Sequence, residues 1–181
     1  DDCIIAWAMN GEALRPEQGY PARLVVPGWE GNMWVKWIRR LEFGDKPYMT
    51  REETSKYTDL LTSGKARMFT WVMEAKSVVT SPSPEKPILQ KGIHQIRGLA
   101  WSGRGKIKRV DVSIDGGKNW KTSKLHGPVF SKSLSRFTFP LNWNGEELLI
   151  QSRAIDETGY VQPHIHELQK VRGLNSIYHN N

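Results

Sequence analysis

The sequence predicts a mainly β protein in two unequal parts, the larger of which is an immunoglobulin-like β-sandwich. Between about residues 65 and 169, seven short strand signals are separated by turn residues and show no helical periodicity. One of them, 110–114, alternates apolar and polar residues and runs into Asp115-Gly116-Gly117, where glycines can adopt positive φ angles. Residues 1–62 hold too few strands to close a core. We therefore expect them to pack on the sandwich or to complete a domain that begins upstream.

The first part, residues 1–62, reads as strand, turn, strand and loop. Its expected elements are a strand at 3–9, a turn at Asn10-Gly11-Glu12, a polar loop at 16–21, a short buried strand at 23–26, another strand at 35–43, and a loop or short helix at 50–56. Thr50 can cap that helix together with Glu53, three residues further on.

The second part, residues 63–181, is expected to be all-β in character over about residues 65–169. Ser81-Pro82-Ser83-Pro84 is an irregular connector between two of its strands. The expected strands are 69–75, 77–80, 92–101, 107–114, 120–124, 135–139 and 148–154.

Composition narrows the class of protein. Apolar residues make up 38% of the 181 residues, which is enough for a packed core, and no apolar stretch is long enough to span a bilayer. The net charge of +7 comes from 26 bases and 19 acids, but the bases are scattered and no aromatic-and-glycine RNA signature accompanies them. The charge therefore favours an acidic protein partner or an anionic substrate over nucleic acid. The abrupt start, without a secretory signal, indicates a mature or truncated fragment.

The sequence gives little evidence for a metal site, a reactive thiol or a hydrolytic active site. Cys3 is the only cysteine, which excludes internal disulfides and a cysteine-clustered zinc site, and we expect it to be a buried structural thiol. His164 and His166 lie two residues apart without a third ligand nearby, so we predict a surface loop and no metal site. No nucleophile-elbow pattern and no motif-placed carboxylate pair is present.

An aromatic stretch holds the most unusual local composition. PGWEGNMWVKW (27–37) contains three of the chain's eight tryptophans around one lysine, Lys36, and follows Arg23 by a few residues. From the residues alone two interpretations stay open. The two bases are either a solvated strand arginine and a lysine lying along tryptophan rings, or a pair that binds an anionic group.

Both parts of the chain contain longer sequence motifs. MNGEAL (9–14) and GYPARLVVPG (19–28) occur in the first, and VDVSIDGGKNW (110–120), SRAIDETGYVQP (152–163) and VRG (171–173) occur in the second. In this order they resemble the sulfite oxidase family of molybdopterin enzymes over nearly the whole chain. Within that family, WEGNMWVKWIRR, PYMTREETSKYTDL and RGLNSIYHNN are most similar to the molybdenum subunit of the bacterial sulfane dehydrogenases.

The resemblance implies that the chain is the C-terminal half of such an enzyme. Residues 1–62 then correspond to the end of the α+β molybdopterin-binding domain, and residues 63–181 to the immunoglobulin-like dimerisation domain. The cofactor implied is molybdenum-molybdopterin. The family's molybdenum-ligating cysteine belongs upstream of MNGE, so Cys3 is not expected to be that ligand, and whether upstream residues were removed or never existed stays open.

The resemblance also assigns cofactor-binding residues. It puts Arg23 and the trio Trp34, Val35 and Lys36 at the pterin, and strand alternation would turn Trp37 into the core. Gln18 stands where several relatives have a histidine that touches the cofactor. A glutamine can still donate and accept hydrogen bonds there, but it cannot become cationic.

Two residues are implied in catalysis. Tyr57 matches the family's active-site tyrosine, whose phenol can donate a hydrogen bond to a metal-bound oxygen or to a sulfur oxyanion. Arg172 matches an arginine that reaches from the second domain into the oxyanion pocket. From the residues alone, a structural role for Tyr57 and for Arg172 is the open alternative. No role is assigned to Tyr178 or His179.

The function implied is that of a periplasmic oxidoreductase that passes electrons to a c-type cytochrome subunit. The substrate would be sulfane sulfur on a sulfur-carrier protein, with sulfite as the alternative, and the second domain would form a homodimer. A non-catalytic dimerisation or docking module is the alternative from another class, and the 181-residue fragment alone is expected to be inactive.

Overall fold

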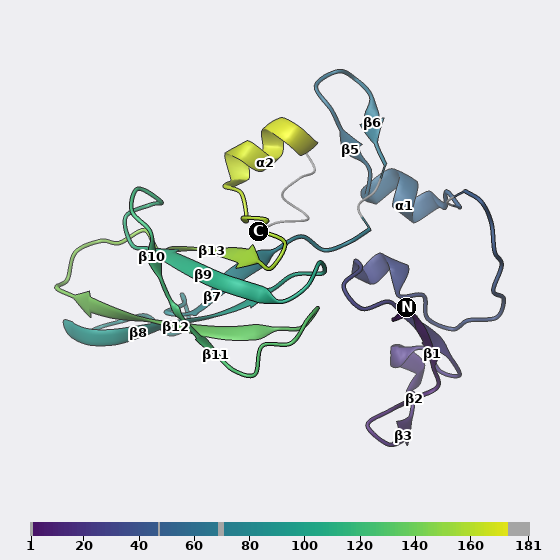
Figure 1. Ribbon diagram of the computed structural model, residues 1–181, viewed down its shortest axis with the longest axis horizontal. Coiled ribbons are helices and arrows are strands. Elements are labelled where there is room, and N and C mark those ends of the chain that lie inside the picture. Colours follow the sequence, from purple (N-terminus) through teal and green to yellow (C-terminus); the bar gives the residue numbers. More distant parts are fainter. Residues whose placement is uncertain (1, 47, 69–70, 174–181) are drawn as a thin grey trace.

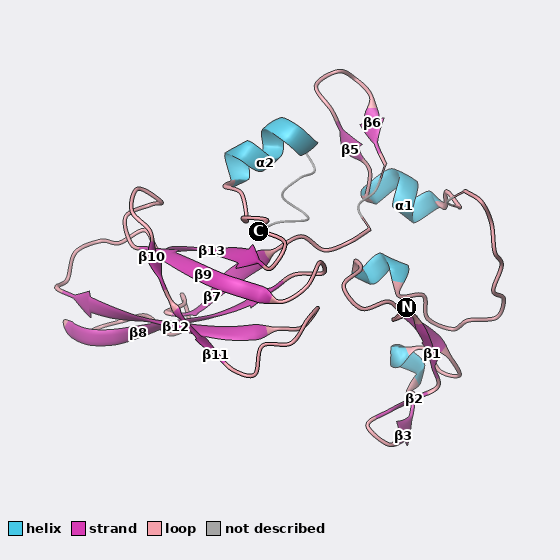
Figure 2. Cartoon of the chain, in the orientation of Figure 1, coloured by secondary structure: helices cyan, strands magenta, loops and turns pink. Residues whose placement is uncertain are grey.

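The computed structural model describes residues 2–46, 48–68 and 71–173. A β-sandwich built from β7 to β13 forms the larger part, and a smaller part of short strands and helices precedes it in the chain (Figures 1 and 2). No helix in these three ranges is long and apolar enough to cross a membrane.

The sandwich consists of two antiparallel sheets. One has the strand order β11-β12-β8-β7 and the other the order β10-β9-β13. Their strands are β7 (Lys76–Ser81), β8 (Gly92–Trp101), β9 (Ile107–Ser113), β10 (Lys121–Thr122), β11 (Lys124–His126), β12 (Ser135–Trp143) and β13 (Gln151–Asp156). The immunoglobulin-like sandwich predicted from the strand spacing is confirmed.

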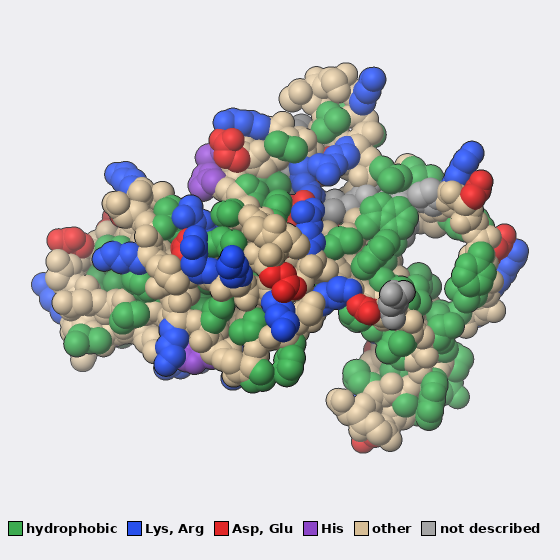
Figure 3. All heavy atoms as spheres, viewed as in Figure 1, with side chains coloured by type: hydrophobic (Ala, Val, Ile, Leu, Met, Phe, Trp, Pro, Cys, Tyr) green, Lys and Arg blue, Asp and Glu red, His purple; other side chains and the backbone are tan. Residues whose placement is uncertain are grey.

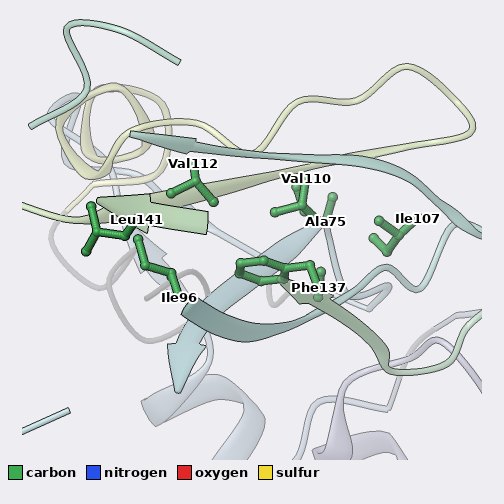
Figure 4. Packing of buried hydrophobic residues seen from close by; sticks show 9 residues of the cluster. Ala75, Ile96, Ile107, Val110, Val112, Phe137 and Leu141 are labelled. Carbon is green, nitrogen blue, oxygen red and sulfur yellow. The ribbon is translucent and has the colours of Figure 1, made fainter. Parts of the chain in front are cut away.

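The core lies between these sheets because alternate side chains of each strand point inward. Val110 and Val112 of β9 face Phe137 of β12 and Ile96 of β8 (Figure 4), and all four are buried. Burial of each such side chain contributes about 1.5–3 kcal/mol. Gly98 pairs with Phe137 across the ladder, and a Cβ at Gly98 would collide with the Phe137 ring, so the register requires a glycine there.

The predicted strand at 120–124 is two strands in different sheets. Lys121 pairs with Val112 in one sheet and Lys124 with Thr138 in the other, with the buried Ser123 between them. Ser123 bonds the Val110 carbonyl oxygen through both its backbone N–H (2.9 Å) and its hydroxyl (2.8 Å). The chain crosses between the sheets at this residue, which local alternation does not reveal.

The smaller part contains three two-stranded ladders, β1-β4, β2-β3 and β5-β6. The β2-β3 ladder closes through Asn10 and Gly11, whose φ angles of 52° and 82° fit an Asn-Gly hairpin turn. The elements of the smaller part are β1 (Ile4–Ala6), β2 (Ala8–Met9), β3 (Glu12–Ala13), η1 (Pro16–Gln18), β4 (Arg23–Val25), η2 (Gly31–Met33), α1 (Arg51–Lys56), β5 (Asp59–Leu60) and β6 (Ala66–Arg67).

Three expectations for this part and the segment after it are wrong. No strand forms over 35–43, because Trp37 has a φ of 54° that interrupts extended backbone, and its side chain is 55% exposed instead of packed in the core. Cys3 is exposed, since the narrow β1-β4 ladder leaves the side chains of β1 uncovered. The described part of the strand expected at 69–75 has only an isolated bridge from Val72 to Trp29.

A C-terminal helix, α2 (Ile165–Arg172), was not predicted. His164 precedes it in extended conformation and its Nδ1 accepts a hydrogen bond from the His166 N–H at 3.4 Å. The two histidines therefore sit at a helix N-terminus, not in a loop. Gly173 directly after the helix, and Lys170 and Arg172 in its last turn, are local signals that could have indicated it.

A tight backbone junction joins the two parts. The Met73 N–H donates to the Gly28 carbonyl oxygen at 2.9 Å, and the Gly103 N–H donates to the Met73 carbonyl oxygen at 2.8 Å. Gly28 has a φ of 84°, and a Cβ there would lie 2.5 Å from the Gly103 carbonyl oxygen. The Trp29 and Trp71 rings pack edge to face at 5.1 Å beside it. The aromatic stretch is thereby fixed to the sandwich.

Candidate functional site

Arg23 is held by main-chain carbonyl groups on both sides. Its Nη1 donates to the Gln18 carbonyl oxygen at 3.1 Å and its Nη2 to the Trp34 carbonyl oxygen at 3.4 Å. The guanidinium carbon lies 5.7 Å from the centroid of the Trp34 ring, a cation–π distance. Its Nε is buried and has no hydrogen-bond partner among the described residues. One donor of a fixed cation is therefore left unsatisfied.

Lys36 lies on the neighbouring segment and is exposed. Its Nζ donates to the Glu17 carbonyl oxygen at 2.8 Å and lies 5.4 Å from the centroid of the Trp37 ring. The Trp37 indole N–H in turn donates to the Pro16 carbonyl oxygen at 2.8 Å. The lysine is thus anchored on the loop that contains η1.

Backbone hydrogen bonds place these two segments side by side. The Leu24 N–H donates to the Val35 carbonyl oxygen at 2.8 Å, and the Trp37 N–H donates to the Gly19 carbonyl oxygen at 3.3 Å. Gly19 has a φ of 110°, and a Cβ there would lie 2.9 Å from the Lys36 Cβ, so only glycine allows this approach. The structure therefore brings together the predicted cofactor-binding residues, which are Gln18, Arg23, Trp34, Val35 and Lys36.

The prediction for Gln18 concerned its side chain, but in the structure its backbone also takes part in the site. Its side-chain oxygen accepts from the Arg15 N–H at 3.0 Å and so helps to close η1. Its backbone carbonyl oxygen is the group that holds Arg23.

The local charges suit an anion. Over the described ranges, neither Arg23 nor Lys36 forms an ion pair, since their hydrogen bonds go to neutral carbonyl groups. Asn32 of η2, which the sequence did not single out, buries both polar atoms of its amide without a described partner. Two cations without counter-charge and an unsatisfied amide can together bind a phosphate and the polar edge of a ring.

Arg172, the last residue of α2, is buried, with 4% of its side chain exposed. Its guanidinium forms an ion pair with Glu74. The following Gly173 packs so closely on β5 that a Cβ there would collide with the Leu60 carbonyl oxygen. The end of α2 is therefore fixed against the short hairpin β5-β6.

Tyr57 lies between α1 and β5 and is half-buried. It comes three residues before Leu60, against which Gly173, the residue after Arg172, packs. Asp59 between Tyr57 and Leu60 is buried, and neither of its carboxylate oxygens has a hydrogen-bond partner in the described part of the chain. The predicted role of neither Tyr57 nor Arg172 is tested by this geometry.

No group of three or more histidine, cysteine, aspartate or glutamate side chains within the described residues is arranged to hold a metal ion. His164 and His166 lie with ring centroids 4.9 Å apart at the start of α2. Tyr178 and His179 lie outside the described residues.

Known families match both parts of the chain. The Mo-co oxidoreductase dimerisation domain matches residues 67–181, and the oxidoreductase molybdopterin binding domain matches residues 1–52. The chain belongs to this molybdopterin oxidoreductase family, the family of sulfite oxidase, as its motifs predicted. The expected domain boundary at 62/63 falls in the turn between β5 and β6 and stays a prediction.

Particular relatives narrow the comparison. This chain is 63% identical to a solved chain of the sulfane dehydrogenase SoxCD from Paracoccus pantotrophus, with a TM-score of 0.92 over 100% of this chain and 47% of that one. Sulfite oxidase of Gallus gallus is 31% identical over 98% of this chain and 42% of its own length. Nitrate reductase [NADH] 2 of Nicotiana tabacum is 30% identical over 90% and 21% respectively. The chain thus spans less than half the length of these relatives.

Proposed function

We propose that the chain is the C-terminal part of a molybdopterin-dependent sulfane dehydrogenase, which oxidises sulfane sulfur attached to a carrier protein. The observation that carries this proposal is the 63% identity, over the whole chain, to the solved sulfane dehydrogenase. Sulfite oxidation is the alternative, and the 31% identity to sulfite oxidase supports it less strongly.

The residues around Arg23 fit one wall of a molybdopterin site. Arg23 and Lys36 would hold the phosphate of the cofactor, since a guanidinium and an ammonium without counter-charge favour an anion. The backbone of Trp34 and Val35, together with the buried amide of Asn32, would contact the polar ring edge. Bound molybdenum supplies the oxygen-atom chemistry that no side chain can supply.

Arg172 and Tyr57 would act on the substrate side of the cofactor. Solvent screens the buried Arg172 guanidinium less than an exposed one, which strengthens its attraction to a sulfur oxyanion, and its ion pair with Glu74 offsets part of its charge. The Tyr57 hydroxyl would donate a hydrogen bond to the same group or to a metal-bound oxygen. Both are catalytic residues under this proposal.

The partners follow from the same function. Electrons would pass to a c-type cytochrome subunit, and the immunoglobulin-like domain would join two copies in a homodimer. The protein would act in the periplasm. The family description of residues 67–181 as a dimerisation domain supports the homodimer, and the similarity to the SoxCD sulfane dehydrogenase supports a partner subunit.

Metal content and turnover of the full-length protein test the proposal. We expect near-stoichiometric molybdenum, and reduction of a c-type cytochrome when a carrier protein bearing a cysteine persulfide is added. Sulfite serves as the comparison substrate under the same conditions. A full-length protein without molybdenum would leave only the non-catalytic module, and faster turnover of sulfite than of the persulfide would favour the sulfite alternative.

A further inference from the structure

Glu74 lies at the point where the aromatic stretch, the sandwich and α2 meet. On its N-terminal side, the Glu30 N–H donates to the Trp71 carbonyl oxygen at 2.7 Å, and Met73 bonds Gly28 as described above. On its C-terminal side, Ala75 is completely buried in the sandwich core. The backbone of Glu74 is therefore fixed from both parts of the protein at once.

The carboxylate of Glu74 gathers three side chains from distant parts of the sequence. Its Oε1 accepts from Arg172 and from the Arg104 Nη2 at 3.4 Å, and its Oε2 accepts from the Tyr160 hydroxyl at 2.9 Å. Only 13% of the Glu74 side chain is exposed. The Arg104 guanidinium also lies 4.9 Å from the centroid of the Tyr160 ring.

This arrangement fixes a side chain that would otherwise have several rotamers. An arginine loses about 2 kcal/mol of rotamer free energy when it is held in one conformation, and a charge-assisted hydrogen bond in a buried place offsets that loss. Because both Glu74 oxygens are engaged, the carboxylate itself has a single orientation. Burial and the hydrogen bond to Glu74 raise the pKa of Tyr160 to about 12, so this donor stays protonated near neutral pH.

We infer that Glu74 is a positioning residue, which holds the Arg172 guanidinium at a fixed place relative to the segment that binds the cofactor. The inference rests on the proposed function, because it takes the oxyanion of the substrate as the ligand of Arg172. Glu74 touches neither substrate nor cofactor, and it acts through Arg172. A sulfur oxyanion would then meet a guanidinium that is already oriented.

The test uses the full-length, molybdenum-loaded protein and inorganic sulfate as the probe. Glu74→Gln keeps the size of the side chain and removes its charge, so Arg172 loses its fixed orientation. We expect the dissociation constant for sulfate, measured by calorimetry, to rise about tenfold. Removal of a negative charge by itself would strengthen anion binding, so a rise reports the lost orientation of Arg172. Glu74→Asp should recover part of the affinity, and molybdenum content should stay unchanged.

Asp111 offers a matched control in the same domain. It is also largely buried and also pairs with two arginines, Arg109 at 3.0 Å and Arg153 at 3.3 Å, but it belongs to strand β9 of the sandwich and its ion pairs go to these two arginines. Asp111→Asn should lower the melting temperature about as much as Glu74→Gln and leave sulfate affinity as in the wild type. Equal losses of sulfate affinity in both variants would reduce Glu74 to a structural residue and overturn the inference.

Arg172→Gln separates the inference from the proposed function. If Arg172→Gln weakens sulfate binding and Glu74→Gln does not, Arg172 binds the oxyanion without help from Glu74, and only the inference fails. If the wild type does not bind sulfate, or Arg172→Gln leaves binding unchanged, the proposed oxyanion site fails as well. If both single variants and the double variant are equally weak, the two residues act as one unit, as inferred.

Discussion

At the scale of single residues, a cation that bonds only to carbonyl oxygens indicates a ligand. Surface arginines and lysines usually lie in water or pair with acids, whereas Arg23 and Lys36 are held in place by backbone groups without a described counter-charge. The positive charge is therefore organised before any anion binds, which lowers the entropic cost of binding.

Replacement of Lys36 by alanine tests this organisation. We expect Lys36→Ala in the full-length protein to weaken cofactor retention about tenfold, because one charge-assisted hydrogen bond is worth about 1.5–3 kcal/mol. Molybdenum per protein after dialysis is the measurement, and Lys108→Ala, at an exposed position on β9, is the control. Normal molybdenum content together with normal turnover would remove Lys36 from the cofactor site.

The residues that sequence reasoning missed share one property. The importance of Glu74 and Asn32 depends on partners, or on the lack of described partners, that only folding reveals. Asn32 was therefore not singled out, although it lies in the same aromatic stretch as Lys36. Arg23 and Lys36 were identified because they stand inside long family motifs. The burial of Cys3 was predicted wrongly because an apolar strand says nothing about what covers it.

At the scale of elements, the strands of the sandwich follow from local signals. β8 has the predicted bounds, and β9 and β7 differ from prediction by at most one residue at each end, because alternation and turn residues act within a few positions. The segment 35–43 failed because a positive φ at Trp37 is set by contacts with η1 and not by strand propensity.

The glycine junction between the two parts permits a paired test on the 181-residue chain. Gly28→Ala places a Cβ 2.5 Å from the Gly103 carbonyl oxygen and strains a φ of 84°, so we expect a loss of about 2–4 kcal/mol in the free energy of unfolding. Gly31→Ala, where a Cβ meets nothing within 4 Å, should change it by less than about 1 kcal/mol. Urea unfolding measures both, and equal effects would mean that the junction is not tightly packed.

The turn after β13 should give acid sensitivity. The buried Asp156 carboxylate accepts from the hydroxyls of Ser102 (2.8 Å) and Thr158 (2.6 Å) and from the Tyr160 N–H (3.2 Å). Burial alone would raise the pKa of Asp156, but these hydrogen bonds outweigh it and the pKa is lowered. Its stabilising contribution is therefore present above the unfolded pKa of about 3.9 and is lost as pH falls through the folded pKa.

Asp156→Asn isolates that contribution. At pH 7 we expect the variant to be less stable than the wild type by about 2 kcal/mol, because an amide cannot replace a carboxylate that only accepts hydrogen bonds. The difference should shrink as pH falls below about 4. Urea unfolding at several pH values measures it, and a difference that stays constant down to pH 3 would show that ionisation of Asp156 does not stabilise the turn.

At the scale of the whole molecule, apolar side chains are distributed very unequally. The sandwich encloses its core between two sheets, whereas Ile4, Ile5, Trp7 and Phe43 of the smaller part are more than half exposed. Figure 3 shows hydrophobic side chains gathered over β1 and its neighbours. The sequence had predicted that the first part holds too few strands to form a core of its own.

This imbalance predicts how a shorter chain behaves. Residues 57–181 keep the sandwich core and the β5-β6 hairpin on which α2 packs, so we expect them to fold alone and to unfold in one cooperative step. If the sandwich is sufficient for dimerisation, light scattering should give twice the mass of the shortened chain at micromolar concentration. A sample of full-length protein is the reference for the oligomeric state. If residues 57–181 form a folded monomer and the full-length protein is a dimer, the dimer contacts lie in the molybdopterin-binding half. If residues 57–181 lose cooperative unfolding, the sandwich depends on the glycine junction for its stability.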